Sequence, residues 1–286
     1  MKITLAQLAP RLGDVPANCE LIEEWAHRAA DDGSATVLFP ELALTGYRLR
    51  DLVPGVAVRL DRAGPVRDRL AELSRRIDLV LGMVEEGPDH RFFNSAAYFA
   101  GGQLRHVHRK CYLPTYGMFD EAMDFARGER LSTFDTPVGR AGLLICEDAW
   151  HPAAATVLAQ DGALMLWTIA ASPLRGTGPG GPTISIESVR KLAEVLARFH
   201  TAPFLFVNRV GFEEGLGFAG GSFAYSATGE LLADAPLLEP VALTVEIDPD
   251  QVRAARSATP LVRDERPWLI SRELARVVRR RSEDEG

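Results

Sequence analysis

Cysteine is scarce in this sequence. Its 286 residues include three cysteines, Cys19, Cys111 and Cys146, and no two of them form a C-x-x-C pair. The odd count and the wide spacing argue against a disulfide framework and against a zinc site built from thiolates. We therefore expect a protein that keeps its thiols free in a reducing cytoplasm and holds no metal.

Long apolar runs and an excess of basic residues are also absent. No stretch approaches the length of a membrane span, and residues 1–10 lack a cleavable signal pattern. The formal net charge of −7 argues against a nucleic-acid partner. The one basic cluster, residues 276–281, precedes an acidic tail and is typical of a solvated helix end. We expect a cytoplasmic protein that binds neither membranes nor nucleic acids.

What is present is an alternation of short apolar runs with amphipathic stretches. A hydrophobic content of 47% and a charged content of 25% are those of an ordinary globular protein. Periodicity predicts strands at residues 35–39, 78–84, 92–99, 104–110, 143–145, 163–169 and 204–208, and helices at residues 66–76, 152–160 and 186–199. No linker or repeat interrupts the alternation. We predict one α/β domain over residues 1–286, with the last ~25 residues forming a C-terminal helical extension.

The stretch from residue 139 to residue 150, GRAGLLICEDAW, contains the first candidate for chemistry. Its apolar run predicts a buried strand, and Cys146 stands where that strand ends. A thiol at such a corner is held rigidly, and the backbone N–H groups beside it can stabilise a thiolate or a developing oxyanion. The alternative is a small buried cysteine that only packs.

Two further residues occupy equivalent places at the ends of other predicted strands. Glu41 follows the run of residues 35–39, and a partly desolvated carboxylate there can serve as a general base. Lys110 ends the run of residues 104–110, where its ammonium can face a developing oxyanion. Taken singly, each has a simpler role, since a glutamate can cap a turn and a lysine can reach out to solvent.

Two histidines offer a competing hypothesis. His106 and His108 lie two residues apart on one predicted strand and therefore share a face, as metal ligands often do. No third ligand is evident close to them in the sequence, so polar packing is the preferred interpretation. A metallohydrolase built on these histidines remains the alternative.

Taken together, Glu41, Lys110 and Cys146 resemble the catalytic set of the nitrilase, or carbon–nitrogen hydrolase, superfamily. The closest likeness is to the glutaminase domain of glutamine-dependent NAD synthetases. Six segments carry it: ELALTGY from residue 41, KCYLPTYGMFDE from 110, ICEDAW from 145, ASP from 171, VNRVG from 207 and GGS from 220.

The resemblance implies a four-layer α-β-β-α sandwich that pairs into larger homo-oligomers through its sheet-flanking helices. It implies Cys146 as nucleophile, Glu41 as general base and Lys110, with the N–H of Glu147, as stabiliser of the oxyanion. Glu121 matches the second glutamate found after the lysine. Residues that would line the substrate pocket are Tyr47, Tyr116, Glu147, Ser172 and Arg175. No metal or organic cofactor is required.

These expectations point to a cysteine-dependent amidohydrolase. The leading hypothesis is a free-standing enzyme that cleaves a small carboxamide or N-carbamoyl amine through a thioester and releases ammonia. No glycine-rich ATP-pyrophosphatase signature follows the last predicted strands. The alternative is a glutaminase subunit that supplies ammonia to a separate synthetase. A nitrilase proper and a non-catalytic binding protein are the weaker interpretations. The loop from Leu174 to Pro182 is expected to decide substrate choice.

Overall fold

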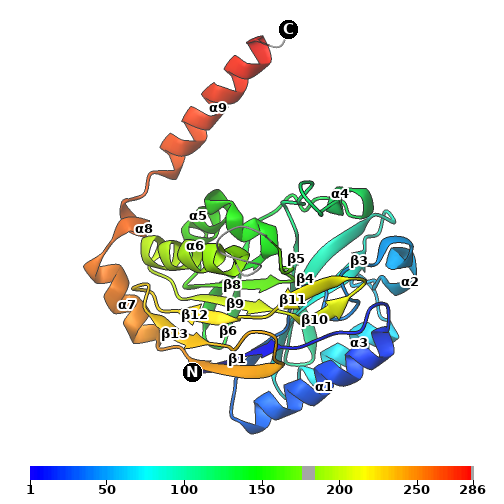
Figure 1. Ribbon diagram of the computed structural model, residues 1–286. Coiled ribbons are helices and arrows are strands. Elements are labelled where there is room, and N and C mark those ends of the chain that lie inside the picture. Colours follow the sequence, from blue (N-terminus) through cyan, green and yellow to red (C-terminus); the bar gives the residue numbers. More distant parts are fainter. Residues whose placement is uncertain (176–183, 285–286) are drawn as a thin grey trace.

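Two six-stranded sheets form the framework of the computed structural model, which describes residues 1–175 and 184–284 (Figure 1). The first sheet has the order β14-β1-β2-β3-β4-β5. Its strands are β1 (Lys2–Gln7), β2 (Thr36–Leu38), β3 (Asp78–Glu86), β4 (Phe92–Ala100), β5 (Gln103–Arg109) and β14 (Val241–Glu246). β1, β2 and β3 run parallel, whereas β14 and β4 pair antiparallel with their neighbours.

The second sheet has the order β13-β12-β9-β8-β7-β6. Its strands are β6 (Thr133–Thr136), β7 (Gly139–Ile145), β8 (Met165–Ala170), β9 (Phe204–Asn208), β12 (Phe223–Tyr225) and β13 (Leu231–Asp234). β7, β8 and β9 run parallel. A separate hairpin, β10 (Val210–Glu213) with β11 (Leu216–Ala219), projects between β9 and β12 in the chain.

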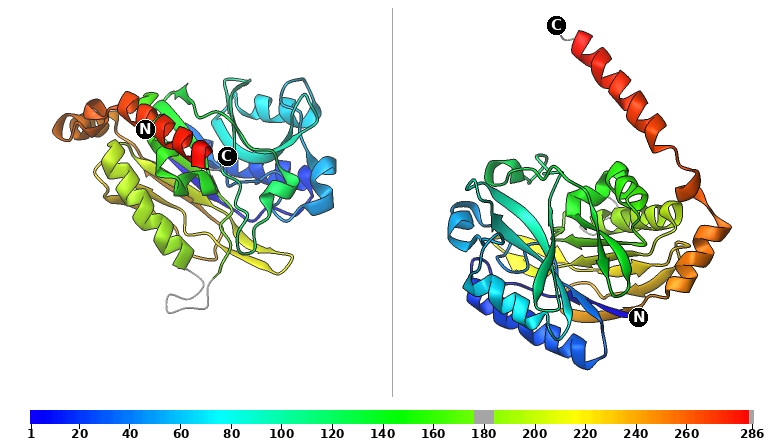
Figure 2. Two further views of the ribbon diagram at one scale, coloured as in Figure 1. Left: turned by 90° about the horizontal axis from the view of Figure 1, so that it is seen from above. Right: turned by 180° about the vertical axis from the view of Figure 1, so that it is seen from behind.

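Helices cover the outer face of each sheet, as the two further views show (Figure 2). α1 (Val15–Asp31) and α3 (Pro65–Leu73) pack on the first sheet, and α5 (Pro152–Gln160) and α6 (Ile184–His200) pack on the second. The remaining helical segments are η1 (Arg50–Leu52), α2 (Val53–Val56), α4 (Glu121–Asp124), η2 (Cys146–Trp150), α7 (Pro249–Ala258), α8 (Leu261–Asp264) and α9 (Pro267–Asp284). The predicted α-β-β-α sandwich is confirmed.

Strand periodicity distributes most buried apolar side chains of the two sheets over three layers, one between the sheets and one beneath the helices on each outer face. Along β7, Leu143 and Ile145 point into the layer between the two sheets, while Leu144 points out toward α5 and α6. Successive side chains of a strand face opposite sides, so a strand buried on both faces is a continuous apolar run. The fully buried Trp167 of β8 belongs to the central layer.

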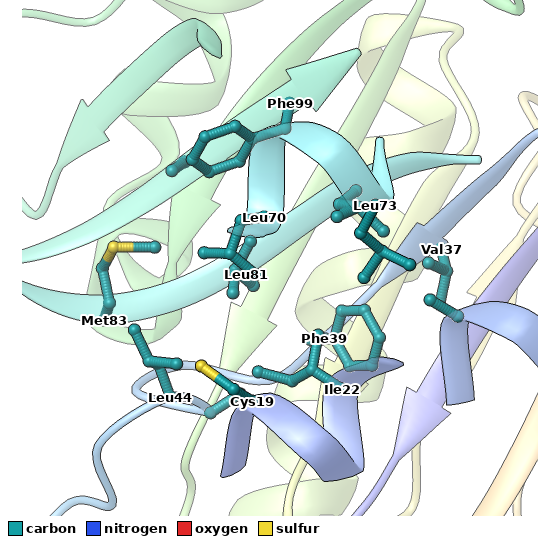
Figure 3. Close-up of a cluster of buried hydrophobic side chains, with 14 of the residues drawn as sticks. Cys19, Ile22, Val37, Phe39, Leu44, Leu70, Leu73, Leu81, Met83 and Phe99 are labelled. Atoms are coloured by element: carbon teal, nitrogen blue, oxygen red, sulfur yellow. The ribbon is translucent and has the colours of Figure 1, made fainter. Parts of the chain in front are cut away.

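α1 shows how local sequence rules create one of these layers. Asp14 accepts a hydrogen bond from the N–H of Ala17 and caps the helix start, and a proline occupies the first turn. Cys19 and Ile22 recur at helical spacing and point into the first sheet (Figure 3). There they pack with Phe39, which follows β2, in the apolar layer between α1 and the first sheet.

Several sequence-based predictions differ from the structure, as three examples show. The helix predicted at residues 66–76 is α3, which ends at Leu73 because tighter turns follow it: the N–H of Arg75 donates to the carbonyl of Glu72 and the N–H of Arg76 to that of Leu73. The strand predicted at residues 163–169 begins at Met165 as β8. The glycine-rich stretch after β9 holds the β10–β11 hairpin, which the periodicity did not reveal.

The C-terminal helices depart from the body of the sandwich. α7 lies against the second sheet, and α9 projects away from it as a separate rod (Figures 1 and 2). Several apolar side chains of α9 are exposed, among them Trp268, Leu274 and Val278. Across the described ranges 1–175 and 184–284, none of the helices combines the length and the apolar character that crossing a membrane requires.

Candidate active site

The carboxyl ends of three strands bring the predicted catalytic residues to one edge of the sandwich. Glu41 follows β2, Lys110 follows β5 and Cys146 follows β7. Hydrogen bonds join Glu41 to Lys110 within the first sheet and to the N–H of Ala171, which follows β8 in the second. In α/β folds, ligand-binding and active sites commonly lie at the carboxyl ends of the strands, as these residues do.

A close approach of backbone to backbone sets the position of Glu41. The turn after β2 lies on β3 at Gly82, whose N–H donates to the carbonyl of Pro40 at 3.2 Å. A Cβ added at residue 82 would lie 2.3 Å from the nitrogen of Leu42 and 2.7 Å from the Cα of Glu41. Only glycine therefore lets the turn sit this close to the sheet.

Glu41 is completely buried, and hydrogen bonds satisfy its carboxylate. Oε1 accepts from Lys110 Nζ at 2.8 Å and from Asn94 Nδ2 at 2.8 Å, and Oε2 accepts from the N–H of Ala171 at 2.7 Å. Oε2 keeps a second lone pair that can take a proton. Sequence reasoning missed Asn94, although an asparagine inside the apolar strand β4 is the kind of signal that could have revealed it.

Lys110 is enclosed between two glutamates. Its side chain is 0% exposed, and Nζ donates to Glu41 Oε1 at 2.8 Å and to both carboxylate oxygens of Glu121 at 2.8 and 2.9 Å. Burial works to lower the pKa of Lys110, but the charges of Glu121 and Glu41 raise that pKa well above its ordinary value. The lysine therefore stays an ammonium.

Glu121, at the start of α4, completes this buried charge cluster. Its carboxylate also accepts a hydrogen bond from the hydroxyl of Tyr47 at 2.7 Å. Burial raises the pKa of Glu121, while Lys110 works in the opposite direction. Burial and the two glutamates raise the pKa of Tyr47 well above its usual range, so this hydroxyl remains a donor. Tyr47 thus supports Glu121 directly.

Cys146 sits at a strained corner. Its φ of +45° is uncommon for any residue other than glycine, and it turns the chain sharply from β7 into η2. Burial raises the pKa of the Cys146 thiol, Glu41 raises it further and Lys110 lowers it. The sulfur is therefore a thiol at rest, so a nearby base has to take its proton before it can attack. Ser172 Oγ lies 3.8 Å from the sulfur.

The other predicted pocket residues form a second group beside Cys146. The hydroxyl of Tyr116 donates to the carboxylate of Glu147 at 3.0 Å. The guanidinium carbon of Arg175 lies 5.5 Å from the ring centre of Tyr116 and 4.9 Å from that of Phe119. This geometry places a cation, a carboxylate and two aromatic rings together. Beyond Arg175, the loop expected to decide substrate choice lies outside the described residues.

The family model described as carbon–nitrogen hydrolase matches residues 2–257 of this chain. The chain belongs to this family. Its members are hydrolases that act on C–N bonds. This carbon–nitrogen hydrolase is 32% identical over 253 residues to the glutamine-dependent NAD(+) synthetase of Thermotoga maritima, an alignment that covers 88% of this chain and 42% of that protein. The chain thus spans less than half the length of that relative.

Two solved structures resemble this carbon–nitrogen hydrolase over most of its length. The glutamine-dependent NAD+ synthetase of Acinetobacter baumannii matches with a TM-score of 0.78 at 29% identity, over 88% of this chain and 46% of that one. An amidase from Nesterenkonia sp. matches with a TM-score of 0.78 at 26% identity, over 95% of both chains. A mutant of that amidase shows covalent addition of the acetamide moiety of fluoroacetamide at its active site cysteine.

The two histidines of β5 have separate surroundings in this carbon–nitrogen hydrolase. His106 stacks on Phe134 with ring centres 4.5 Å apart, and burial lowers its pKa to about 4. His108 Nε2 lies 2.8 Å from Asp148 Oδ2. Ligand atoms of His108, Cys111 and Asp148 lie within 4.8 Å of one another, so among the described residues His108 belongs to a cluster that does not include His106. Asp148 comes from η2, so sequence proximity could not show it.

These three residues nevertheless make a poor cation site. Each oxygen of Asp148 already accepts two N–H donors. Burial raises the pKa of Cys111 to about 12, so its sulfur is a thiol rather than the thiolate a metal prefers. The donor set fits hydrogen bonding between protein groups.

Proposed function

We propose that this chain is a cysteine-dependent amidohydrolase that cleaves a small carboxamide or N-carbamoyl amine through a thioester and releases ammonia. One observation carries the proposal: a fully buried ammonium, Lys110, is held between Glu41 and Glu121 and acts electrostatically on the Cys146 thiol. A nucleophile beside its base and a fixed positive charge are what acyl transfer needs.

The proposed reaction starts with a proton transfer. Glu41 takes the proton of the Cys146 thiol, and the sulfur attacks the amide carbon. Lys110, together with the N–H of Glu147, stabilises the negative charge that develops on the amide oxygen. Glu41 then returns the proton to the departing nitrogen, the C–N bond breaks and ammonia leaves. Water that gives a proton to Glu41 attacks the thioester, which releases the carboxylic acid and restores the thiol.

Glu121 and Tyr47 have supporting roles in this scheme. Glu121 fixes the ammonium of Lys110 from the side opposite Glu41, and the hydroxyl of Tyr47 fixes Glu121. Glu41 and Glu121 are therefore not equivalent, although both contact the lysine. We propose that Glu41 exchanges protons and that Glu121 does not, because two of the hydrogen bonds from Lys110 end on Glu121.

Substrate choice is assigned to Tyr116, Glu147, Ser172 and Arg175. Arg175 faces the site with its guanidinium against two aromatic rings, an arrangement suited to a substrate carboxylate. An ω-amide that also carries a carboxylate would use both Cys146 and this arginine. Replacing Arg175 with Leu should raise KM for such amides about tenfold or more, and leave propionamide hydrolysis unchanged.

The alternative is a glutaminase that supplies ammonia to a separate synthetase. The identity to glutamine-dependent NAD synthetases over 88% of this chain supports it. Glutamine carries both a carboxamide and a carboxylate, so Arg175 is compatible with this reading too. The two hypotheses share the chemistry of Cys146 and differ in the substrate and in the fate of ammonia.

Ammonia release from a panel of amides tests the proposal and separates the alternatives. The panel contains glutamine, asparagine, ω-amides of dicarboxylates, N-carbamoyl amines and aliphatic amides. Cys146→Ala should abolish release, whereas the matched control Cys19→Ala, which removes a buried thiol from α1, should not. Turnover of glutamine alone supports the glutaminase reading, and preference for another amide supports the amidase. Full activity in Cys146→Ala would refute both.

Labelling with fluoroacetamide provides a second, independent test. Peptide mapping by mass spectrometry should find the acetamide adduct on Cys146 before it appears on Cys19 or Cys111. A label that favours Cys111, the other partly exposed thiol, would remove the basis for treating Cys146 as the nucleophile.

We also propose that the protein assembles as a homo-oligomer through the helices on the second sheet. Val157 of α5 and Phe199 of α6 are exposed apolar residues on these helices, and Leu274 of α9 is exposed beyond them. Analytical ultracentrifugation should give a mass at least twice that of the chain, and Phe199→Glu should reduce it. A monomer at micromolar concentration would rule this assembly out.

A further inference from the structure

Asp148 is a buried carboxylate that the proposed chemistry does not use. It lies in η2, two residues after Cys146, and its side chain is 0% exposed. Four donors surround it. Oδ1 accepts from the N–H groups of Cys111 and Tyr112, both at 3.0 Å, and Oδ2 accepts from the N–H of Ile145 at 3.0 Å and from His108 Nε2 at 2.8 Å.

These donors belong to the two segments that carry the reacting groups. Cys111 and Tyr112 directly follow Lys110 at the end of β5, and Ile145 directly precedes Cys146 at the end of β7. β5 is an edge strand of the first sheet and β7 belongs to the second. Asp148 therefore ties together the ends of two strands from different sheets, next to the lysine and next to the nucleophile.

A charged carboxylate suits this place better than any neutral side chain of the same size. It accepts hydrogen bonds on both oxygens and donates none, whereas an amide would turn N–H groups toward other N–H groups on one side. Burial alone would raise the pKa of Asp148, but the hydrogen bonds from His108 and from the backbone lower it below its usual range. The group is therefore ionised and can hold all four donors.

We infer that Asp148 is a positioning residue that sets the separation between the Lys110 ammonium and the Cys146 sulfur, with His108 orienting its carboxylate. The inference rests on the proposed function and deepens it, because it names the residue that keeps the Lys110 ammonium and the Cys146 sulfur at a fixed separation. The strained backbone of Cys146 needs such support, since a residue with positive φ persists only where its surroundings fix it. His108, which sequence analysis considered as a metal ligand, acquires a role in this way.

Kinetics of Asp148→Asn test the inference. The substitution keeps the shape but turns an NH₂ group toward two N–H donors, so the ends of β5 and β7 should shift apart. We expect kcat to fall about 100-fold while KM changes less than about threefold, because misplacement of the reacting groups by an ångström costs that much. His108→Leu leaves three backbone donors on Asp148 and should lower kcat about tenfold.

The matched control is Asp78→Asn. Asp78 is also a partly desolvated carboxylate with a hydrogen-bonded partner, Tyr98, but it lies at the opposite end of β3 from the site. This variant should keep kcat even if its melting temperature falls. A purely structural role for Asp148 would lower the folded fraction and leave kcat per folded molecule unchanged, and that result would overturn the inference.

Alkylation of Cys146 by iodoacetamide distinguishes failure of this inference from failure of the proposed function. The Lys110 charge lowers the pKa of the thiol, so an ammonium that moves away should slow alkylation at pH 8.5 by about threefold or more. Peptide mapping follows Cys146 separately from the other thiols. If wild type hydrolyses no amide, the proposed function fails, but slower labelling in Asp148→Asn still supports the positioning role. Equal labelling rates in folded wild type and variant would overturn it.

Discussion

The edge that holds the candidate active site and the helix α9 use charged side chains in opposite ways. At the edge, Lys110 and Glu41 are both 0% exposed and every hydrogen bond of the ammonium is to a glutamate. On α9, Glu273 pairs with Arg272 and Arg276, but all three side chains are about half exposed to solvent. Both regions contain short ion pairs, so distance alone does not separate them.

Burial makes the difference between the two regions. Water screens the ion pairs of α9, and pairs of this kind contribute little to folding. At the edge Lys110 and Glu41 are fully buried, so removing one charge leaves its partners desolvated and unpaired. An ion pair on the surface is therefore replaceable, whereas one in the site constrains several residues at once. The following predictions test this contrast, starting with the largest expected effect.

Lys110→Met should have the largest effect on both activity and folding. It removes the charge proposed to stabilise the oxyanion, so kcat should fall by about 10³-fold. It also leaves Glu41 and Glu121 facing each other without a cation, which should lower the free energy of unfolding by about 3 to 5 kcal/mol at pH 8. Urea unfolding and ammonia release measure the two effects.

The destabilisation by Lys110→Met should shrink as the pH falls toward 5, because burial raises the pKa of Glu121 and this carboxylate can then take up a proton. Lys191→Met provides the control, since Lys191 is an exposed lysine on α6. Equal losses in these two variants would contradict the contrast between buried and exposed charge.

Glu121→Gln should have an intermediate effect. The amide keeps the size of the side chain, but its single oxygen replaces two acceptors of Lys110, so the ammonium loses part of its restraint. We expect kcat to fall about 100-fold with little change in KM. Tyr47→Phe removes one hydrogen bond from Glu121 and should cost about tenfold. Steady-state kinetics of both variants would contradict the proposed hierarchy if Tyr47→Phe proved the more damaging.

The burial of His106 predicts that the free energy of unfolding depends on pH, without any contribution from an ion pair. Its folded pKa of about 4 lies below the ordinary value, so between pH 6.5 and pH 4 the unfolded chain binds a proton that the folded chain does not. Stability therefore falls as the pH is lowered through this range, by at most about 3 kcal/mol.

His106→Phe should remove that contribution, because a phenylalanine can stack on Phe134 and does not titrate. The comparison uses the difference in unfolding free energy between wild type and variant from pH 7 to pH 4. A difference that stays constant over this range would assign the pH dependence to other groups.

Glu273→Gln should have the smallest effect. The substitution breaks both ion pairs of Glu273 on α9. The melting temperature of the protein and its rate of ammonia release should stay within experimental error of wild type, at low salt and at high salt alike. A clear loss of either would mean that α9 docks on another surface in solution, as the proposed oligomer would allow.

The sequence, together with the family resemblance, was sufficient to predict the fold, and it nominated Glu41, Lys110 and Cys146 as candidate catalytic residues. Glu41 and Cys146 each follow a short apolar run, Lys110 follows the largely polar strand β5, and the carboxyl ends of these strands meet at one edge. That rule needs only local periodicity. The family resemblance supplied Glu121, which begins the four-residue helix α4, a segment too short to give a periodic signal of its own.

Contacts between segments that are far apart in the chain could not be predicted from the sequence. Asn94 reaches Glu41 across 53 residues and Asp148 reaches His108 across 40, and neither spacing corresponds to a local rule. Tyr47 was assigned to the pocket, but its hydroxyl is occupied by Glu121. The β10–β11 hairpin was not predicted, because glycines interrupt the alternation of apolar and polar residues that marks a strand. Such features arise from packing, which a single sequence does not display.

Gly82 has a consequence for how this protein can vary through evolution. Its missing side chain makes room for the turn that carries Glu41, which lies 41 positions earlier in the chain. A change from glycine to alanine here would count as conservative by any chemical measure, and it would leave the apolar character of β3 intact. Lineages that hydrolyse amides should nevertheless retain glycine at this position, and lineages that lose it should lose selection on Glu41 soon afterwards. Selection on the proposed role of Glu41 should therefore also act on position 82, although residue 82 has no side chain in the site.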